Sequence, residues 1–148
     1  MTRSSLRRAF TLVEILIVVV ILGILSAVVV PQFSHATQDS KLQATVQQLR
    51  HVRNAIDVYG LQHANQFPEV TEGDGTWGEL MTLGYLRQKP VNHWVGGDNA
   101  TMIIFGDAAD GAWTNEHGWI YRAPTDELAS PWVWAAGFDG SDQAYDPE

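Results

Sequence analysis

An uninterrupted apolar run near the N-terminus sets the strongest limit on what this chain can fold into. Between Phe10 and Val30 the only ionisable side chain is Glu14, and three arginines precede the run. As a helix the run rises roughly 31 Å, about the thickness of the hydrocarbon core of a bilayer. Basic residues before an apolar span remain in the cytoplasm. The pattern therefore predicts a transmembrane helix over residues 10–30, with its N-terminus in the cytoplasm.

Glu14 is the residue of this run that calls for an explanation. A carboxylate at the centre of a membrane helix costs roughly 2.5–3.5 kcal/mol on insertion scales, and less near an end. A secretory signal has an apolar region of about 7–15 residues before a small-residue cleavage site, such as Ser34-His35-Ala36. A twin-arginine signal would use Arg7-Arg8, and a plain anchor would stay uncut. None of these three alternatives accounts for the glutamate.

The residues around Glu14 resemble the processing site of a known family. The stretch Ala9-Phe10-Thr11-Leu12-Val13-Glu14 is similar to the cleavage and methylation motif of type IV pilins and of the pseudopilins of type II secretion. The resemblance implies a prepilin leader of residues 1–9, cut by a prepilin peptidase between Ala9 and Phe10. It also implies N-methylation of Phe10. Where the family usually has glycine before the cut, this chain has Ala9.

Cleavage would place a new charge next to the glutamate. In a helical stack of subunits, Glu14 of one chain can meet the Phe10 amine of its neighbour. Pairing neutralises both charges where the dielectric constant is low, and a wrong register leaves a charge buried and unpaired. Gly23 and Pro31 match further assembly positions of the family helix. The resemblance implies a homopolymer whose partners are other pseudopilins or pilins, an assembly ATPase and its membrane platform.

The helix is expected to continue beyond the membrane to about residue 63. Pro31 removes one helical hydrogen bond and presses on the preceding turn, which predicts a kink or local melting there. Beyond it, apolar side chains recur mainly at three- and four-residue spacing, which is typical of a helix with one buried face. These are Phe33, Ala36, Leu42, Val46, Leu49, Ile56 and Tyr59. Residues 31–148 are therefore expected to form one pilin-like domain.

The remainder of the chain predicts short elements. Thr76 is expected to cap a helix over 77–83, with Glu79 completing a capping box and Gly84 ending the helix in a left-handed conformation. Three β-rich segments follow, which are 101–105, 118–122 and 132–136. They predict an antiparallel sheet of three to four strands packed on the outer half of the long helix. The predicted fold class is α+β, with a pilin-like fold.

The C-terminal tail is a candidate calcium site. Asp139, Asp142 and Asp146 lie in a turn-prone stretch, and oxygen-rich loops suit Ca²⁺. Major pseudopilins of type II secretion resemble this chain, with a calcium loop after the last strand that contains a Gly-x-Asp-Gly step. The step here is Gly137-Phe138-Asp139-Gly140, so the resemblance implies Asp139 as a ligand, with Asp142 and Asp146 beside it. The alternative is an ordinary solvated acidic tail.

Charge and composition exclude several functions. Residues 1–30 carry a formal charge of +2 and residues 31–148 carry −10, within a total of −8. Because an acidic domain repels phosphate, no nucleic acid is expected as a partner. The absence of cysteine excludes disulfides and thiol catalysis. The histidines are scattered, and no nucleophile elbow, phosphate-binding loop or dinucleotide fingerprint occurs. The sequence therefore predicts that the chain is not an enzyme.

These observations predict a structural protein of the cell inner membrane. It is expected to cross the membrane once, with its N-terminus in the cytoplasm and its C-terminal domain in the periplasm. The resemblance implies a subunit of the pseudopilus of a type II secretion system, forming a surface or periplasmic filament after leader cleavage and N-methylation. The stretches Phe67-Pro68 and Gly84-Tyr85-Leu86, with Pro90 and Trp94, resemble segments of the major pseudopilin, so the resemblance favours that subunit. A type IV pilus pilin, major or minor, is the alternative within the family.

Two alternatives belong to other classes. One is a membrane-anchored periplasmic binding module that uses an exposed aromatic platform of Trp119, Trp132 and Trp134. Trp132 and Trp134 are expected to share a strand face, with Trp119 beside them on a neighbouring strand. Core packing is favoured for one or two of them, because a small domain needs large side chains to bury enough area. The other alternative is a single-span periplasmic enzyme, which predicts a cleft with clustered polar groups.

Overall fold

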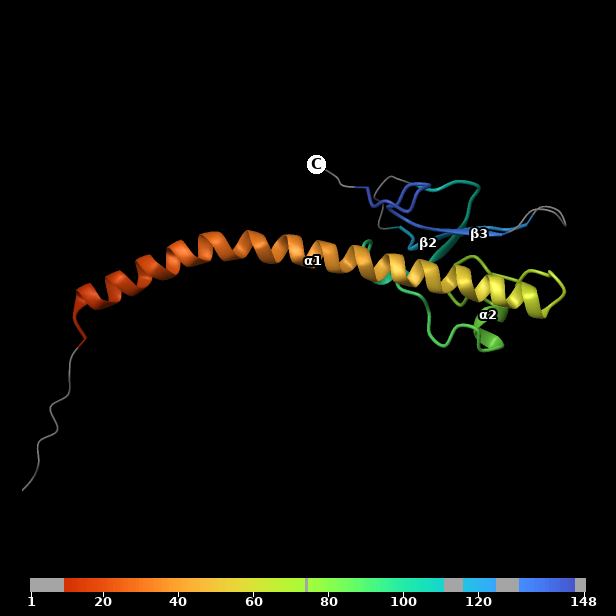
Figure 1. Cartoon of the computed structure of the whole chain (residues 1–148), viewed down its shortest axis with the longest axis horizontal. Helices are drawn as coiled ribbons and strands as arrows, with labels where there is room; N and C mark the ends of the chain where they lie inside the picture. Colours follow the sequence, from red (N-terminus) through yellow and green to blue (C-terminus); the bar gives the residue numbers. More distant parts are fainter. Residues whose placement is uncertain (1–9, 74, 111–115, 125–130, 146–148) are drawn as a thin grey trace, which may run out of the picture. The chain divides into compact units, whose positions relative to one another are not determined.

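A computed structural model describes residues 10–73, 75–110, 116–124 and 131–145, without the side chains of residues 30–34 (Figure 1). Helix α1 spans Leu12–Gln62 and is followed by the short helix α2 (Glu79–Thr82) and the 3-10 helix η1 (Asp98–Thr101). The strands found within these residues are β1 (Ile103–Phe105), β2 (Trp119–Arg122) and β3 (Trp132–Ala135). Contacts divide the chain into an N-terminal unit, Met1–Thr37, and a C-terminal unit, Gln38–Glu148.

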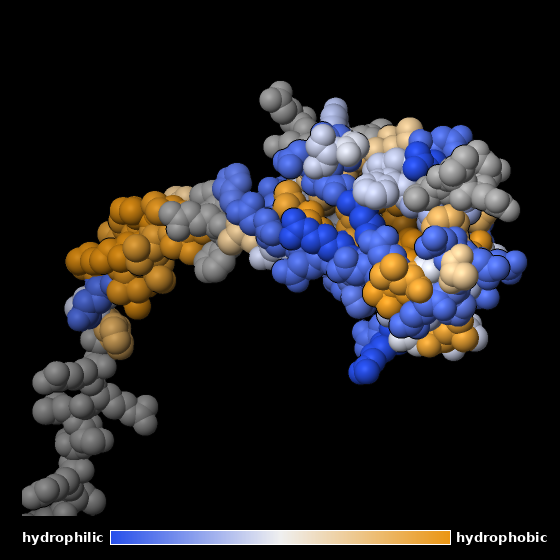
Figure 2. All heavy atoms as spheres, turned by 45° about the vertical axis from the view of Figure 1, so that its right-hand side comes forward, coloured by the Kyte–Doolittle hydropathy of each residue, from blue (hydrophilic) through white to orange (hydrophobic). Residues whose placement is uncertain are grey.

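The N-terminal unit presents an apolar surface. Side chains from Thr11 to Val29 are exposed, and Figure 2 shows apolar side chains gathered along this part of the helix. The stretch Leu12–Val29 is long and apolar enough to cross a membrane, judged by length and composition alone. Helix α1 continues through Pro31 as an α-helix, so the alternative of local melting at this proline is wrong. A helix that is apolar on all sides needs lipid or protein around it.

The core of the C-terminal unit lies between helix α1 and the sheet, and Figure 1 shows β2 and β3 running beside this part of the helix. Helix α1 contributes Leu49, Val52, Ala55, Ile56 and Tyr59, and Leu42 and Val46 pack against them, which confirms the predicted apolar face from residue 42 onward. The prediction is wrong for Ala36, which is exposed, and the side chain of Phe33 lies outside the described atoms. Full burial of side chains such as Leu or Ile stabilises the fold by about 1.5–3 kcal/mol each. The sheet, helix α2 and the loops supply the other buried side chains, including Trp77, Leu80, Leu86, Ile103, Trp119, Tyr121, Val133 and Phe138.

The three strands have the order β1-β2-β3 in the described part of the chain. Strand β3 is antiparallel to β2, with Val133 opposite Tyr121. Strand β1 is parallel to β2, with Ile104 opposite Ile120, so the prediction of a wholly antiparallel sheet is wrong for this pair. A parallel pair needs a connection of about a dozen residues or more. The segment from Gly106 to Gly118 is long enough to return the chain to the same end of the sheet.

The register also corrects the expected arrangement of the tryptophans. Trp119 pairs with Ala135, whereas Trp134 pairs with Ile120, so Trp119 and Trp134 lie on opposite faces of the sheet. The exposed fractions of Trp119, Trp134 and Trp132 are 0%, 8% and 41%. Trp119 belongs to the core, where its ring lies edge-on to Trp77 at 6.3 Å between centroids. The three tryptophans therefore do not form an exposed platform.

Helix α2 begins later than the sequence predicted. Its N-cap is Gly78, which makes no side-chain capping bond, so the capping box of Thr76 and Glu79 is not formed. Trp77 and Gly78 have φ angles of +53° and +48°, and a right-handed helix cannot include them. Glu79 instead accepts hydrogen bonds from the Tyr59 hydroxyl at 2.6 Å and from the Glu69 amide at 3.1 Å. The predicted left-handed conformation of Gly84 is confirmed by its φ of +84°.

Candidate functional site

The predicted assembly residue Glu14 lies in the first turn of helix α1, where Thr11 caps the helix. The Thr11 amide and hydroxyl donate to Glu14 Oε2 at 2.9 and 3.0 Å. In return, the Glu14 amide donates to Thr11 Oγ1 at 3.2 Å. This reciprocal pattern is a capping box, which satisfies amide groups that the first turn otherwise leaves without partners. The sequence reasoning missed Thr11, although Thr-x-x-Glu before an apolar run is the signal for it.

The surroundings of Glu14 are apolar and open. Phe10, Leu12 and Val13 are exposed by 80%, 82% and 58%. Among the described residues Glu14 makes its contacts with Thr11 and takes part in no ion pair. The cleavage residue Ala9 and the leader 1–9 lie outside the described residues. The first turn thus carries a single carboxylate on a surface otherwise suited to lipid or to other helices.

Gly23 and Pro31 lie further along the same helix and do not form one cluster with Glu14. A Cβ placed on Gly23 would meet no atom within 4 Å, so nothing in the single chain requires a glycine at this position. Pro31 belongs to the helical backbone, and its side chain lies outside the described atoms. The three residues are therefore separate positions along one helix and form no common site in the single chain.

The C-terminal loop, residues 137–145, contains the described calcium candidates. Phe138 is fully buried and anchors the loop in the core. Asp139 Oδ1 accepts hydrogen bonds from the amides of Ser141 and Gln143 at 2.8 and 2.9 Å. Both carboxylate oxygens of Asp142 bind the guanidinium of Arg53 on helix α1, at 2.5 and 2.9 Å. The third candidate, Asp146, lies outside the described residues.

The described part of this loop does not fit a calcium ion. Calcium takes 6–8 oxygen ligands, and no group of three or more acidic or histidine side chains gathers anywhere in the described chain. Asp139 Oδ1 accepts from two backbone amides instead, and both carboxylate oxygens of Asp142 accept from Arg53. A guanidinium beside Asp142 also repels a second cation. Calcium binding by the tail therefore stays an untested prediction.

A long apolar helix with a capped glutamate in its first turn, continuing into a small α+β unit, defines a pilin-like protein. Residues 4–30 match the family described as the prokaryotic N-terminal methylation motif. The chain is 30% identical over 104 residues to type II secretion system core protein G of Escherichia coli (strain K12), covering 64% of this chain and 71% of that relative. The chain belongs to the family of type II secretion system core protein G.

Further relatives carry the same name. Core protein G of Klebsiella michiganensis is 29% identical over 129 residues, which is 74% of this chain and 88% of the relative. Core protein G of Klebsiella pneumoniae is 36% identical over 98 residues, which is 60% of this chain and 69% of the relative. No solved structure matches the chain. Membership in this family of major pseudopilins confirms the prediction of a structural subunit rather than an enzyme.

Proposed function

We propose that this chain is inserted in the inner membrane as a prepilin, is cut between Ala9 and Phe10, is methylated on Phe10, and then assembles into the pseudopilus of a type II secretion system. The proposal rests mainly on the exposed apolar surface of Leu12–Val29, in which Glu14 is the only charged residue. Such a surface suits lipid before assembly and the helices of neighbouring subunits afterwards. The family to which the chain belongs supports this assignment.

The charge distribution supports the proposed topology. Three arginines precede the apolar span, and the residues beyond it carry a net charge of −10. Basic residues hold the N-terminus in the cytoplasm, and the C-terminal unit then lies in the periplasm. In that orientation the bond between Ala9 and Phe10 faces the cytoplasm, where a prepilin peptidase reaches it. The assembly ATPase and the membrane platform are the further partners of this proposal.

Glu14 is placed to control the register of assembly. Cleavage creates an ammonium group on Phe10, one helical turn before the carboxylate. The contacts with Thr11 occupy Glu14 Oε2. They leave Oε1 available to the ammonium of a neighbouring subunit. Within a dry helix stack, a subunit shifted from this register would bury both charges without partners, which is strongly unfavourable.

Intact-mass measurement of the membrane fraction tests this proposal. The expected mass corresponds to loss of residues 1–9 and gain of one methyl group. Expression without a prepilin peptidase is the control, and it should give the uncut chain. An uncut chain in the presence of the peptidase, or a cut near Ala36, would contradict the proposed processing.

A further inference from the structure

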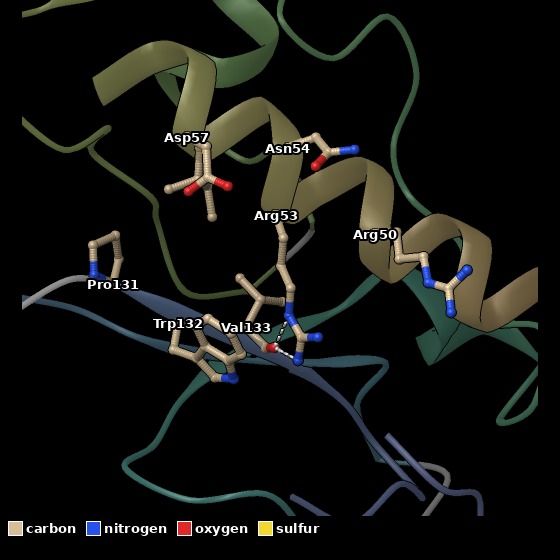
Figure 3. Close-up of a pocket in the computed structure, with 8 residues that line it drawn as sticks. Arg50, Arg53, Asn54, Asp57, Pro131, Trp132 and Val133 are labelled. Atoms are coloured by element: carbon tan, nitrogen blue, oxygen red, sulfur yellow. Dashed lines mark hydrogen bonds between the residues drawn. The ribbon is translucent and has the colours of Figure 1, made fainter. Parts of the chain in front are cut away.

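One guanidinium joins three segments of the C-terminal unit. Arg53, on helix α1, donates from Nε and Nη2 to the carbonyl oxygen of Val133 on β3, at 3.0 and 2.7 Å. Its Nη1 and Nη2 donate to the two oxygens of Asp142 in the C-terminal loop. The guanidinium carbon also lies 4.3 Å from the centre of the Trp132 ring. Figure 3 shows the side chain extending from the helix to the Val133 carbonyl beside Trp132.

We infer that the guanidinium of Arg53 holds the C-terminal loop in place. In this chain it takes the place of the calcium ion that the family resemblance implies. The C-terminal unit therefore folds and stays folded without calcium. The inference rests on contacts within the C-terminal unit and does not depend on the proposed function. The inference does not involve Asp146.

The geometry of the pair separates it from an ordinary surface salt bridge. Exposed pairs contribute about 0–1 kcal/mol because water screens them and long side chains lose freedom. Here the exposed fractions of the Arg53 and Asp142 side chains are 17% and 32%. The contact uses both carboxylate oxygens, and a planar guanidinium is suited to this two-point binding. The hydrogen bonds to the Val133 carbonyl hold the guanidinium from its other side.

The backbone of the loop depends on this pair. Asp142 has a φ of +60°, in the left-handed region that side chains other than glycine seldom adopt. Such a conformation persists where surrounding contacts determine it. The Asp142 amide donates to the carbonyl of Asp139 at 3.1 Å, and its carboxylate is held by Arg53. The loop thus has two anchors, which are Phe138 in the core and Asp142 on the helix.

Calcium could enter at Asp142 only by displacing Arg53. Displacement would leave the guanidinium of Arg53, whose side chain is 17% exposed, without its anion, and a largely buried charge without a partner is unfavourable. The positive charge that a metal would bring is already present in the covalent chain. Moreover, it is present before the protein leaves the cytoplasm, whatever the calcium concentration outside.

Thermal melting of the full chain in detergent micelles tests the inference, with excess calcium chloride or with a chelator. Tryptophan emission reports the C-terminal unit, because all the tryptophans lie between Trp77 and Trp134. Wild type is expected to have the same Tm in both solutions. Arg53→Met should lower Tm by about 5 °C or more. Arg50→Met is the matched control, since Arg50 lies one turn earlier, is exposed and makes no ion pair among the described residues.

Two further variants keep the test decisive if Arg53→Met does not fold. Asp142→Asn should lower Tm, and Arg53→Lys should lower it less than Arg53→Met, because a lysine keeps the charge but not the two-point contact. A lower Tm of wild type with chelator, restored by calcium, would overturn the inference. An unchanged Tm in both Arg53→Lys and Asp142→Asn would overturn it as well. A Tm that calcium raises in Arg53→Met but not in wild type would support it.

Discussion

Thr11 and Glu14 bind each other at the first turn of helix α1, each accepting a backbone amide hydrogen of the other. Glu14 therefore has two tasks in the proposed filament, which are to cap its own helix and to receive the ammonium of a neighbour. The two tasks use different properties of the side chain. Capping needs an acceptor oxygen, whereas pairing with an ammonium needs a negative charge.

Substitution of Glu14 separates these tasks. Glu14→Gln keeps an acceptor oxygen for Thr11 but removes the charge, and Glu14→Ala removes both. We expect both variants to insert in the membrane and to give at least about tenfold less filament, because breaking a buried ion pair costs about 3–5 kcal/mol. The yield of sheared filament relative to membrane-bound subunit measures this. If Glu14→Gln gave as much filament as wild type, assembly would not need the charge of Glu14, and only its capping role would remain.

Gly23 offers a second test of helix packing. In the single chain a Cβ at this position meets nothing within 4 Å, so Gly23→Leu should leave insertion and processing unchanged. Small residues let helices approach closely, and a leucine should therefore reduce filament yield several-fold. Val19→Leu, at an exposed position one turn earlier, is the control. Equal filament yields from the two variants would mean that Gly23 is not at a close helix contact.

Stability of the C-terminal unit should fall in alkaline solution. The hydrogen bond from Tyr59 to Glu79 raises the pKa of Tyr59 to about 12, and burial raises the pKa of Tyr121 to about 12. In the unfolded chain both phenols titrate near pH 10. Between about pH 10 and pH 12 the native state thus keeps protons that the unfolded state has released. The stabilising contribution is complete below pH 10 and is lost as the pH approaches 12.

Tyr59→Phe tests this pH dependence. The slope of unfolding free energy against pH corresponds to about two protons for wild type and should correspond to about one in the variant. Urea unfolding of the full chain in micelles, followed by tryptophan emission between pH 9 and 12, measures the slope. An identical slope in both proteins would show that Tyr59 titrates normally.

Asn92 is a buried hydrogen-bonding centre of the C-terminal unit. Its Nδ2 donates to the carbonyls of Gly118 and Ala136 at 2.8 and 3.0 Å, beside strands β2 and β3. Its Oδ1 accepts from the amides of Trp94 and Val95 at 3.0 and 3.1 Å. One buried side chain therefore binds four backbone groups. Two of these have a second partner, because the Gly118 carbonyl also accepts from the Ala136 amide and the Trp94 amide also donates to Thr45 Oγ1.

Asn92→Ala should destabilise the C-terminal unit by about 2 kcal/mol or more, because it removes the partner of the Ala136 carbonyl and of the Val95 amide, and each buried polar group left without a partner costs about 1–3 kcal/mol. The midpoint of urea unfolding measures the change. Asn54→Ala, at an exposed position on helix α1, should alter stability by less than about 0.5 kcal/mol. A similar small effect from Asn92→Ala would mean that water or a local shift replaces its bonds.

Local signals predicted much of the fold. The apolar run and the spacing from Leu42 to Tyr59 predicted one long helix ending near residue 63, and helix α1 ends at Gln62. Each of the three β-rich segments contains a strand, and Gly84 has its predicted left-handed conformation. These features are set by periodicity and by backbone preferences, which a few neighbouring residues determine.

Features that depend on distant residues were not predictable in this way. The parallel pairing of β1 and β2, and the placement of Trp119 and Trp134 on opposite faces, follow from the register between strands. Arg53 and Asp142 are 89 positions apart, and no local pattern links them. Thr11 is different, because Thr-x-x-Glu directly before an apolar run is itself a local capping signal.

The bonds from Arg53 to Val133 affect what happens when C-terminal units crowd together. Strand β3 forms an edge of the described sheet, since β2 is its only partner there. An open edge is a template on which a strand of another molecule can add. The Val133 carbonyl on this edge is already occupied by Arg53. At that point a neighbouring strand meets a guanidinium tied to Asp142, so addition of a strand to the β3 edge is obstructed there.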